Sequence, residues 1–145
     1  MTATPDFELH GTAVNLTLAV SQLVRRLRAE TNSSGLTLSQ LSAMARIERD
    51  GPTTTADLAR AESMKPQSMG AVLASLEQQG FVLRQAHPTD GRQILFALTP
   101  LGAKERSRRD TAKRQWIEAA LSRLSPEERE ALVAAIPLIK RLGDS

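Results

Sequence analysis

The stretch that decides the fold is residues 65–99, KPQSMGAVLASLEQQGFVLRQAHPTDGRQILFALT. Its first part spaces apolar residues three and four apart and stops at Gly80, which predicts a helix with one buried face. Beyond Gly80 the apolar period falls to two, which predicts strands at 81–86 and 94–99. The intervening residues 87–93 contain Pro, Asp and Gly, so they predict a polar loop at the tip of a hairpin.

A shorter helix precedes this stretch. Thr54 or Thr55 is a suitable N-cap, and the helix is expected to reach Ala61 before a three-residue turn. Ala59 is the small residue that two closely crossing helices need. The residues expected in the core are Leu58, Met69, Val72, Leu73 and Leu76. A helix-turn-helix followed by a hairpin predicts a winged helix-turn-helix fold.

Longer helices flank this region on both sides, and the sequence predicts them at residues 7–30, 38–50, 100–124 and 126–142. The first helix and the last two carry more apolar surface than a small helix–hairpin domain can cover. Packing against one another and against a second copy of the chain is the simplest use of that surface.

The predicted fold class is therefore mainly α (α+β), a winged helix-turn-helix domain with N- and C-terminal dimerisation helices. The expected domains are an N-terminal dimerisation helix and loop at 1–35, a winged helix-turn-helix domain at 36–99, and C-terminal dimerisation helices at 100–145. Together they are expected to form one intertwined structural unit.

Composition excludes several classes of function. The chain has 145 residues and no Cys, which removes disulfides, thiolate metal sites and cysteine nucleophiles. Its two His lie on different predicted elements, and we find no metal-ligand cluster, no Gly-rich phosphate loop and no nucleophile elbow. We therefore expect no metal, no cofactor and no enzyme activity. No apolar run of membrane-spanning length and no signal peptide at residues 1–6 are found, so a cytoplasmic protein with no membrane partner is expected.

The charge distribution is compatible with nucleic acid. The formal net charge is +3, and residues 55–114 hold ten Lys or Arg against six acidic residues. Aromatic residues make up 3% of the chain, which argues against binding single strands by base stacking. From the helix pair alone, a DNA-binding domain and a tri-helical core without a DNA partner both remain open. The basic run at 104–114 is expected to be mainly a solvated helical face, with phosphate contacts as the alternative.

The candidate DNA-binding residues lie at two places. Gln67 and Ser68 are in the first turn of the second helix, with Lys65 just before it, where a helix that enters the major groove presents its side chains to base edges. Arg92 is at the hairpin tip, from which an arginine can enter a minor groove. Asp90 could orient Arg92 or tether the loop to Arg84. The alternatives are an ordinary exposed helix start and a solvated turn.

Taken together, these residues resemble the MarR family of transcriptional regulators. The resemblance rests on an ordered series: Leu58-Ala59, Met64, Ser68-Met69, Leu76-Glu77, Gly80-Phe81-Val82-Leu83-Arg84, His87-Pro88-x-Asp90-Gly91-Arg92 and Leu98-Thr99-Pro100-Leu101-Gly102. It implies a homodimer that binds a near-palindromic operator in double-stranded DNA and often represses. The helix at 65–79 is then expected in the major groove and Arg92 in the minor groove.

The resemblance also implies release of DNA by a small aromatic or anionic effector. Such effectors bind family members between the dimer helices and the DNA-binding lobe, and His10, Asn15 and Trp116 are weak candidates to line that site. The chain departs from the family at Lys65, where many members carry a capping Ser or Thr, and at Glu62, where an apolar residue is common. A winged-helix dimer that serves protein–protein contact is the alternative function.

Overall fold

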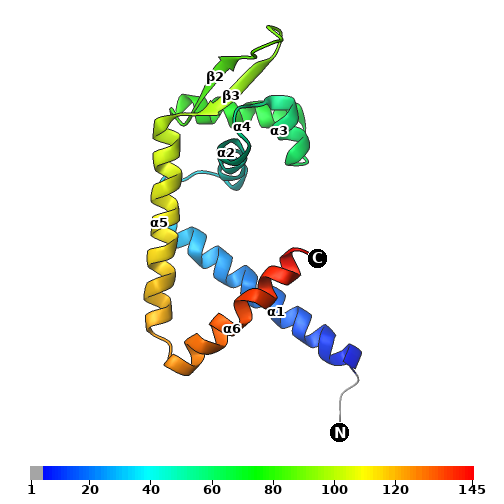
Figure 1. The fold of residues 1–145 in the computed structure, drawn as a ribbon, viewed down its shortest axis with the longest axis vertical. Helices are drawn as coiled ribbons and strands as arrows, with labels where there is room; N and C mark the ends of the chain where they lie inside the picture. Colours follow the sequence, from blue (N-terminus) through cyan, green and yellow to red (C-terminus); the bar gives the residue numbers. More distant parts are fainter. Residues whose placement is uncertain (1–4) are drawn as a thin grey trace. The chain divides into compact units, whose positions relative to one another are not determined.

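The computed structural model describes residues 5–145, with side chains from residue 8 onward (Figure 1). Residues 1–4, which belong to the stretch tested for a signal peptide, lie outside the described residues. The helices are α1 (Pro5–Thr31), α2 (Leu38–Asp50), α3 (Thr55–Ala61), α4 (Pro66–Gln78), α5 (Pro100–Ser122) and α6 (Pro126–Gly143). The strands are β1 (Thr53–Thr54), β2 (Val82–Ala86) and β3 (Ile94–Leu98).

The mainly α winged-helix fold is confirmed, and each predicted helix and strand is present to within two residues at either end. The structure adds β1, which the sequence did not predict. It places Thr53 opposite Phe96 on β3, so the antiparallel sheet has the order β1-β3-β2. On the other side of β3, the register places Val82 opposite Leu98.

The chain divides into two compact units. One comprises α1 with residues 112–145, and the other comprises residues 32–111. We call them the helical unit and the winged unit, and each is described by itself.

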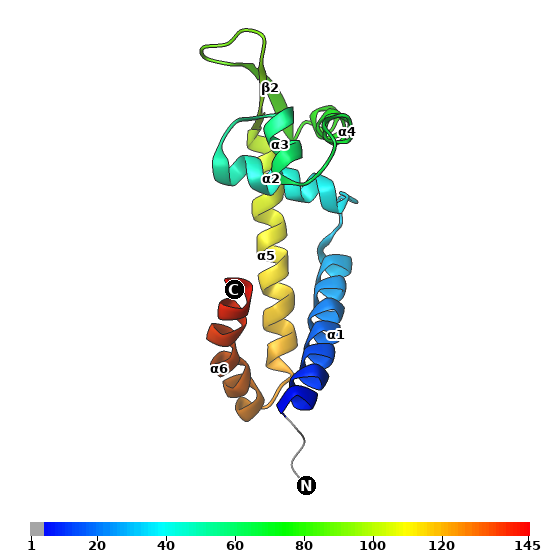
Figure 2. The same cartoon turned by 90° about the vertical axis from the view of Figure 1, so that its right-hand side faces the viewer.

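The winged unit has a continuous hydrophobic core. Its buried residues come from the loop before α2 and from α2, α3, α4 and the sheet: Leu36, Ala43, Met44, Ile47, Leu58, Ala59, Met69, Leu73, Leu76, Val82 and Phe96. The predicted core positions are confirmed except for Val72, which is only partly buried. Figures 1 and 2 both show the β2–β3 hairpin projecting beyond these helices. The core thus fixes the base of the hairpin and leaves its tip in solvent.

The start of α5 is joined tightly to the sheet. The Thr99 hydroxyl donates to the Gly80 carbonyl at 2.6 Å and accepts from the Gly102 amide at 2.9 Å. A Cβ at position 102 would overlap the carbonyl oxygen of Phe81 and approach Leu98 Cδ1 to 2.9 Å. Glycine is therefore required here by close approach of the backbone.

The helical unit has no comparable core. Among the described residues, none of its apolar side chains is buried. Figure 1 shows α1 and α6 extending away from the second half of α5 on the same side and crossing in that view. Among residues 8–145, whose side chains the structure describes, the exposed large apolar residues of α1 and α6 are Leu9, Val14, Leu16, Leu18, Val20, Leu23, Val24, Leu132, Val133, Ile136, Leu138, Ile139 and Leu142. The single chain leaves this surface uncovered. Capping boxes at Thr37 and Ser125 set the starts of α2 and α6.

Candidate nucleic-acid interface

The helix-turn-helix is closed by backbone hydrogen bonds around a strained residue. Thr54 caps α3 by accepting from the Asp57 amide at 3.1 Å. In the turn, the Met64 amide donates to the Ala59 carbonyl at 2.8 Å, and Ser63 has φ of +53°. Positive φ is costly for a residue with a side chain. The fixed turn sets the angle at which α4 leaves α3.

Glu62 ties this turn to α2. Its carboxylate accepts from Arg46 Nε and from Ser42 Oγ, each at 2.8 Å. The hydrogen bonds from Arg46 and then Ser42 lower the pKa of the Glu62 carboxyl below its usual value. The family that the sequence resembles commonly has an apolar residue where Glu62 stands. The polar side chains of Arg46 and Ser42 on α2 compensate for the charge of Glu62 at this position.

The first turn of α4 presents three exposed polar side chains. Lys65 occupies the N-cap position without a side-chain capping bond, as the sequence predicts, and Pro66 opens the helix. Gln67 and Ser68 follow on the exposed side, while Met69 is buried. Among the described residues, no hydrogen bond or ion pair to the side chains of Lys65, Gln67 or Ser68 is found. Amide, hydroxyl and ammonium groups are thus free to meet an external partner.

The wing, which comprises β2, the wing loop 87–93 and β3, holds Arg92 at its tip. The Arg92 side chain is 96% exposed, and its Nε lies 3.6 Å from Asp90 Oδ1. The same Asp90 oxygen accepts from the Arg92 backbone amide at 3.0 Å, and Asp90 Oδ2 accepts from Gln93 Nε2 at 3.3 Å. Asp90 therefore holds the backbone beneath Arg92 more closely than it holds the guanidinium.

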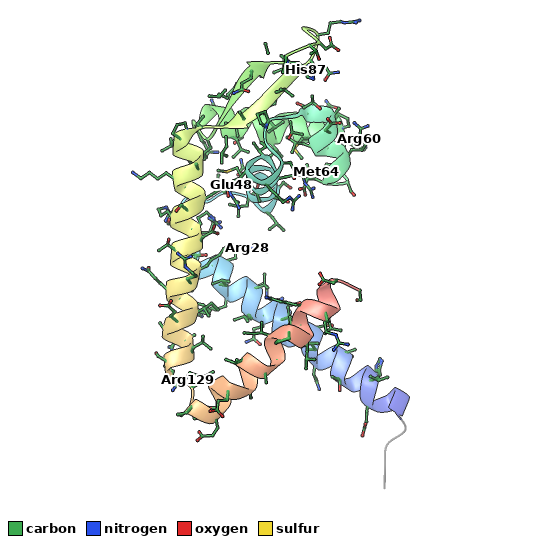
Figure 3. All side chains as sticks on the ribbon, viewed as in Figure 1. Arg28, Glu48, Arg60, Met64, His87 and Arg129 are labelled. Carbon is green, nitrogen blue, oxygen red and sulfur yellow. The ribbon has the colours of Figure 1, made fainter. Side chains whose placement is uncertain are left out.

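A hollow of about 480 Å³ lies between α3 and the wing. Its lining residues include Thr54, Thr55, Arg60 and Arg92. Figure 3 shows Arg60 on α3 and His87 on the wing. The sequence did not single out Arg60, because its pairing with Asp57 at 2.6 Å is typical of an exposed helical i,i+3 pair.

Arg84 is not tethered to Asp90. Its Nε donates to Glu77 Oε2 at 3.0 Å and Oε1 at 3.2 Å, and its guanidinium carbon lies 5.5 Å from the centre of the Phe96 ring. The expectation that Asp90 tethers the loop to Arg84 is therefore corrected. Glu77, near the end of α4, is the carboxylate that pairs with Arg84.

The basic run at 104–114 is a solvated face only in part: Lys104, Arg108 and Arg114 are exposed, whereas two other arginines of the run turn toward the winged unit. Arg109 is 4% exposed and donates to Asn32 Oδ1 at 2.8 Å, and burial lowers its pKa. Arg106 lies 3.1 Å from Glu48, and Arg108 pairs with Glu105. Arg109 thus attaches the loop before α2 to the first half of α5, and Arg106 attaches α2, whereas the Arg108–Glu105 pair lies within α5.

The other predicted site residues lie in the helical unit. His10 and Asn15 are exposed on α1, and Trp116 is half-buried on α5. In the described part of the chain, no hydrogen bond or ring contact joins these three residues. Over residues 5–145, the structure has no cluster of three potential metal-binding side chains and no helix long and apolar enough to cross a membrane.

Comparison with known proteins agrees with this geometry. Residues 36–94 match the model of the MarR family. An HTH-type transcriptional regulator of Mycobacterium bovis is 40% identical over 91% of this chain and 92% of its own length. An HTH-type transcriptional repressor of Mycobacterium tuberculosis is 33% identical over 72% of this chain and 78% of its own. The crystal structure of a transcriptional regulator protein from Pseudomonas aeruginosa, 31% identical, superposes with a TM-score of 0.84 over 99% of both chains.

Proposed function

The chain belongs to the MarR family of transcriptional regulators, and from this premise we propose that it binds a near-palindromic operator in double-stranded DNA as a homodimer. One observation carries the proposal. The same hydrophobic core supports the first turn of α4, whose polar side chains are exposed, and the wing, which ends in the exposed Arg92.

The first turn of α4 is suited to the major groove. Gln67 can pair with adenine through its amide, and Ser68 can donate to or accept from several bases. Lys65 contacts a phosphate or a guanine edge. This set is small and carries one cation, so phosphate contacts and the wing supply much of the affinity.

The wing is suited to the minor groove. A narrow minor groove concentrates negative potential, which attracts an inserted arginine. Arg92 makes that contact, and Asp90 positions it through the Arg92 amide. Arg84 also belongs to the proposed contacts, but it must exchange Glu77 for a phosphate to reach DNA, so its contribution is smaller than that of Arg92.

Dimerisation explains the uncovered apolar surface of the helical unit. Surfaces of this extent mark interaction sites, and a second copy of the same chain offers the complementary apolar stripes on α1 and α6. The domains proposed at 1–35 and 100–145 would supply this interface, and 36–99 the DNA contact. Two α4 helices would then enter successive major grooves about 34–36 Å apart on a symmetric site.

Repression and release by a small molecule complete the proposal. A relative named as a repressor supports the first. For the second, a small aromatic or anionic effector that binds one spacing of the two α4 helices better than another would shift operator affinity. His10, Asn15 and Trp116 remain the weak candidates for its site.

Selection of binding sites from genomic fragments tests the proposal. We expect enrichment of one near-palindromic sequence, and Arg92→Ala should weaken binding to it about tenfold or more, as loss of a charged groove contact does. Arg123→Ala is the matched control, because it removes the same charge from the helical unit and should bind as wild type. Weak binding without sequence preference would favour the protein–protein module instead.

A further inference from the structure

The wing loop is closed around the imidazole of His87. Its Nδ1 lies 3.0 Å from the backbone nitrogen of Asp90 and 3.2 Å from that of Thr89. Both backbone groups are donors, so Nδ1 must offer its lone pair, and the ring proton belongs on Nε2. The closed loop therefore requires a neutral imidazole with one defined tautomer.

The hydrogen bonds of the loop run from this imidazole to Arg92. The ring accepts from the Asp90 amide, and the Asp90 carboxylate accepts from the Arg92 amide at 3.0 Å. The Asp90 carbonyl accepts from the Gln93 amide at 3.1 Å, and the Gln93 carbonyl accepts from the His87 amide at 3.3 Å. The loop is a closed ring of contacts, and the imidazole is its one titratable acceptor besides the Asp90 carboxylate.

We propose that His87 is a positioning residue of the wing, and that proton uptake on its Nδ1 opens the wing loop and weakens operator binding. This inference rests on the proposed minor-groove contact of Arg92. An imidazolium carries N–H on both ring nitrogens, so Nδ1 can accept from neither Thr89 nor Asp90. Protonation replaces two hydrogen bonds from backbone amides by the opposition of three N–H donors. The Thr89 hydroxyl oxygen, 3.4 Å from Nδ1, can accept from the new N–H, but it does not restore an acceptor for either amide.

The charged groups around the loop are few. Asp90 and Arg92 belong to the loop itself, and Asp57 and Arg60 of α3 line the hollow that Arg92 shares. No charged residue lies on β3, and Arg84 of β2 is paired with Glu77. Imidazole is the side chain that changes charge between about pH 5 and 8. The chain has two His and no Cys, and His10 lies in the helical unit.

Two variants, His87→Asn and His87→Ala, separate the hydrogen-bond acceptor of residue 87 from its ability to become charged. Asn Oδ1 stands the same number of bonds from the backbone as His Nδ1, and it accepts hydrogen bonds without titrating. His87→Asn should therefore keep the loop closed at every pH, whereas His87→Ala should leave both amides without an acceptor. The Thr89 and Asp90 amides report on His87 alone, because the other imidazole, His10, lies in the helical unit.

The test measures two quantities at about pH 8 and about pH 5.5 at constant salt. One is operator affinity, and the other is the exchange and chemical shift of the Thr89 and Asp90 amides in the protein without DNA. At the higher pH we expect wild type and His87→Asn to bind alike and His87→Ala about tenfold more weakly. At the lower pH wild type should approach His87→Ala, while His87→Asn should keep its affinity and its protected amides.

The outcomes distinguish this inference from the proposed function. It is wrong if the Thr89 and Asp90 amides of wild type do not respond to pH, or if they respond equally in His87→Asn. A loss of affinity at low pH without an amide response also overturns it, because another group is then titrating. If the amides respond as expected but Arg92→Ala binds the operator as tightly as wild type, the wing contact of the proposed function fails instead.

Discussion

Arg84 connects the end of α4 to the wing through Glu77: its Nε lies 3.0 Å from Glu77 Oε2, and its guanidinium also stacks over Phe96. Glu77 is in the last turn of α4, and Arg84 is in the middle of β2. The two elements proposed to touch DNA are thereby joined by a polar contact in addition to the core beneath them.

Arg84→Ala should lower the free energy of unfolding by about 1 kcal/mol, since it removes a partly exposed ion pair and a cation–π contact. Glu77→Gln should cost less, because the stacking on Phe96 remains. Urea denaturation measures both, and operator binding by Arg84→Ala should fall less than that of Arg92→Ala. Unchanged stability in Arg84→Ala would show that the contact is incidental.

Glu62 should make stability depend on pH in the acid range. Its pKa is lowered in the folded protein, chiefly by the hydrogen bond from Arg46, so its contribution is present above the unfolded value near 4.5. That contribution is lost as pH falls through the lower folded value. Glu62→Gln should be about 1 kcal/mol less stable at neutral pH, and the gap should shrink below pH 4.5.

Unfolding of both proteins in urea across this range is the measurement. Glu105, whose pKa Arg108 also lowers, is present in both and cancels in the difference. A gap that stays constant with pH would contradict the role given to the Glu62 charge.

Ser63 has positive φ, so a substitution there should change the free energy of unfolding more than is usual at an exposed position. Ser63→Gly should be neutral or stabilise by about 0.5 kcal/mol, as relief of strain offsets the greater entropy of an unfolded glycine. Ser63→Val should cost more than about 1 kcal/mol, because β-branched residues tolerate this conformation poorly. Ser33→Val, in a loop residue without positive φ, is the thermal-denaturation control and should lie within about 0.5 kcal/mol of wild type.

Two helical glycines should respond in opposite directions to the same substitution. Gly102→Ala should destabilise by about 2 kcal/mol or more, since its Cβ meets the Phe81 carbonyl and Leu98. Gly70→Ala, inside α4 with no neighbouring atom within 4 Å, should stabilise by about 0.5–1 kcal/mol through helix propensity. Equal effects on the unfolding midpoint would contradict the close approach seen at Gly102.

Local signals predicted most of the fold. Capping residues such as Thr37 and Ser125 and the turn at 87–93 determine where elements begin and end, and these act over a few residues. β1 was missed because two threonines carry no pattern, and their pairing depends on Phe96 more than forty positions away.

In the candidate site, too, some features follow from the local sequence and others depend on contacts that only folding creates. Exposure of Lys65, Gln67, Ser68 and Arg92 follows from helical and turn position, and the structure confirms it. The roles of Arg109 and Arg84 depend on partners brought close only by folding, Asn32 and Glu77. The acceptor role of His87 required a closed loop, which no spacing in the sequence reveals.

The stoichiometry of the complex with a duplex carrying one selected palindrome tests the central claim most directly. Sedimentation equilibrium should give two chains per duplex, and free protein of twice the mass of one chain. One chain per duplex, bound to the symmetric site with undiminished affinity, would contradict the account.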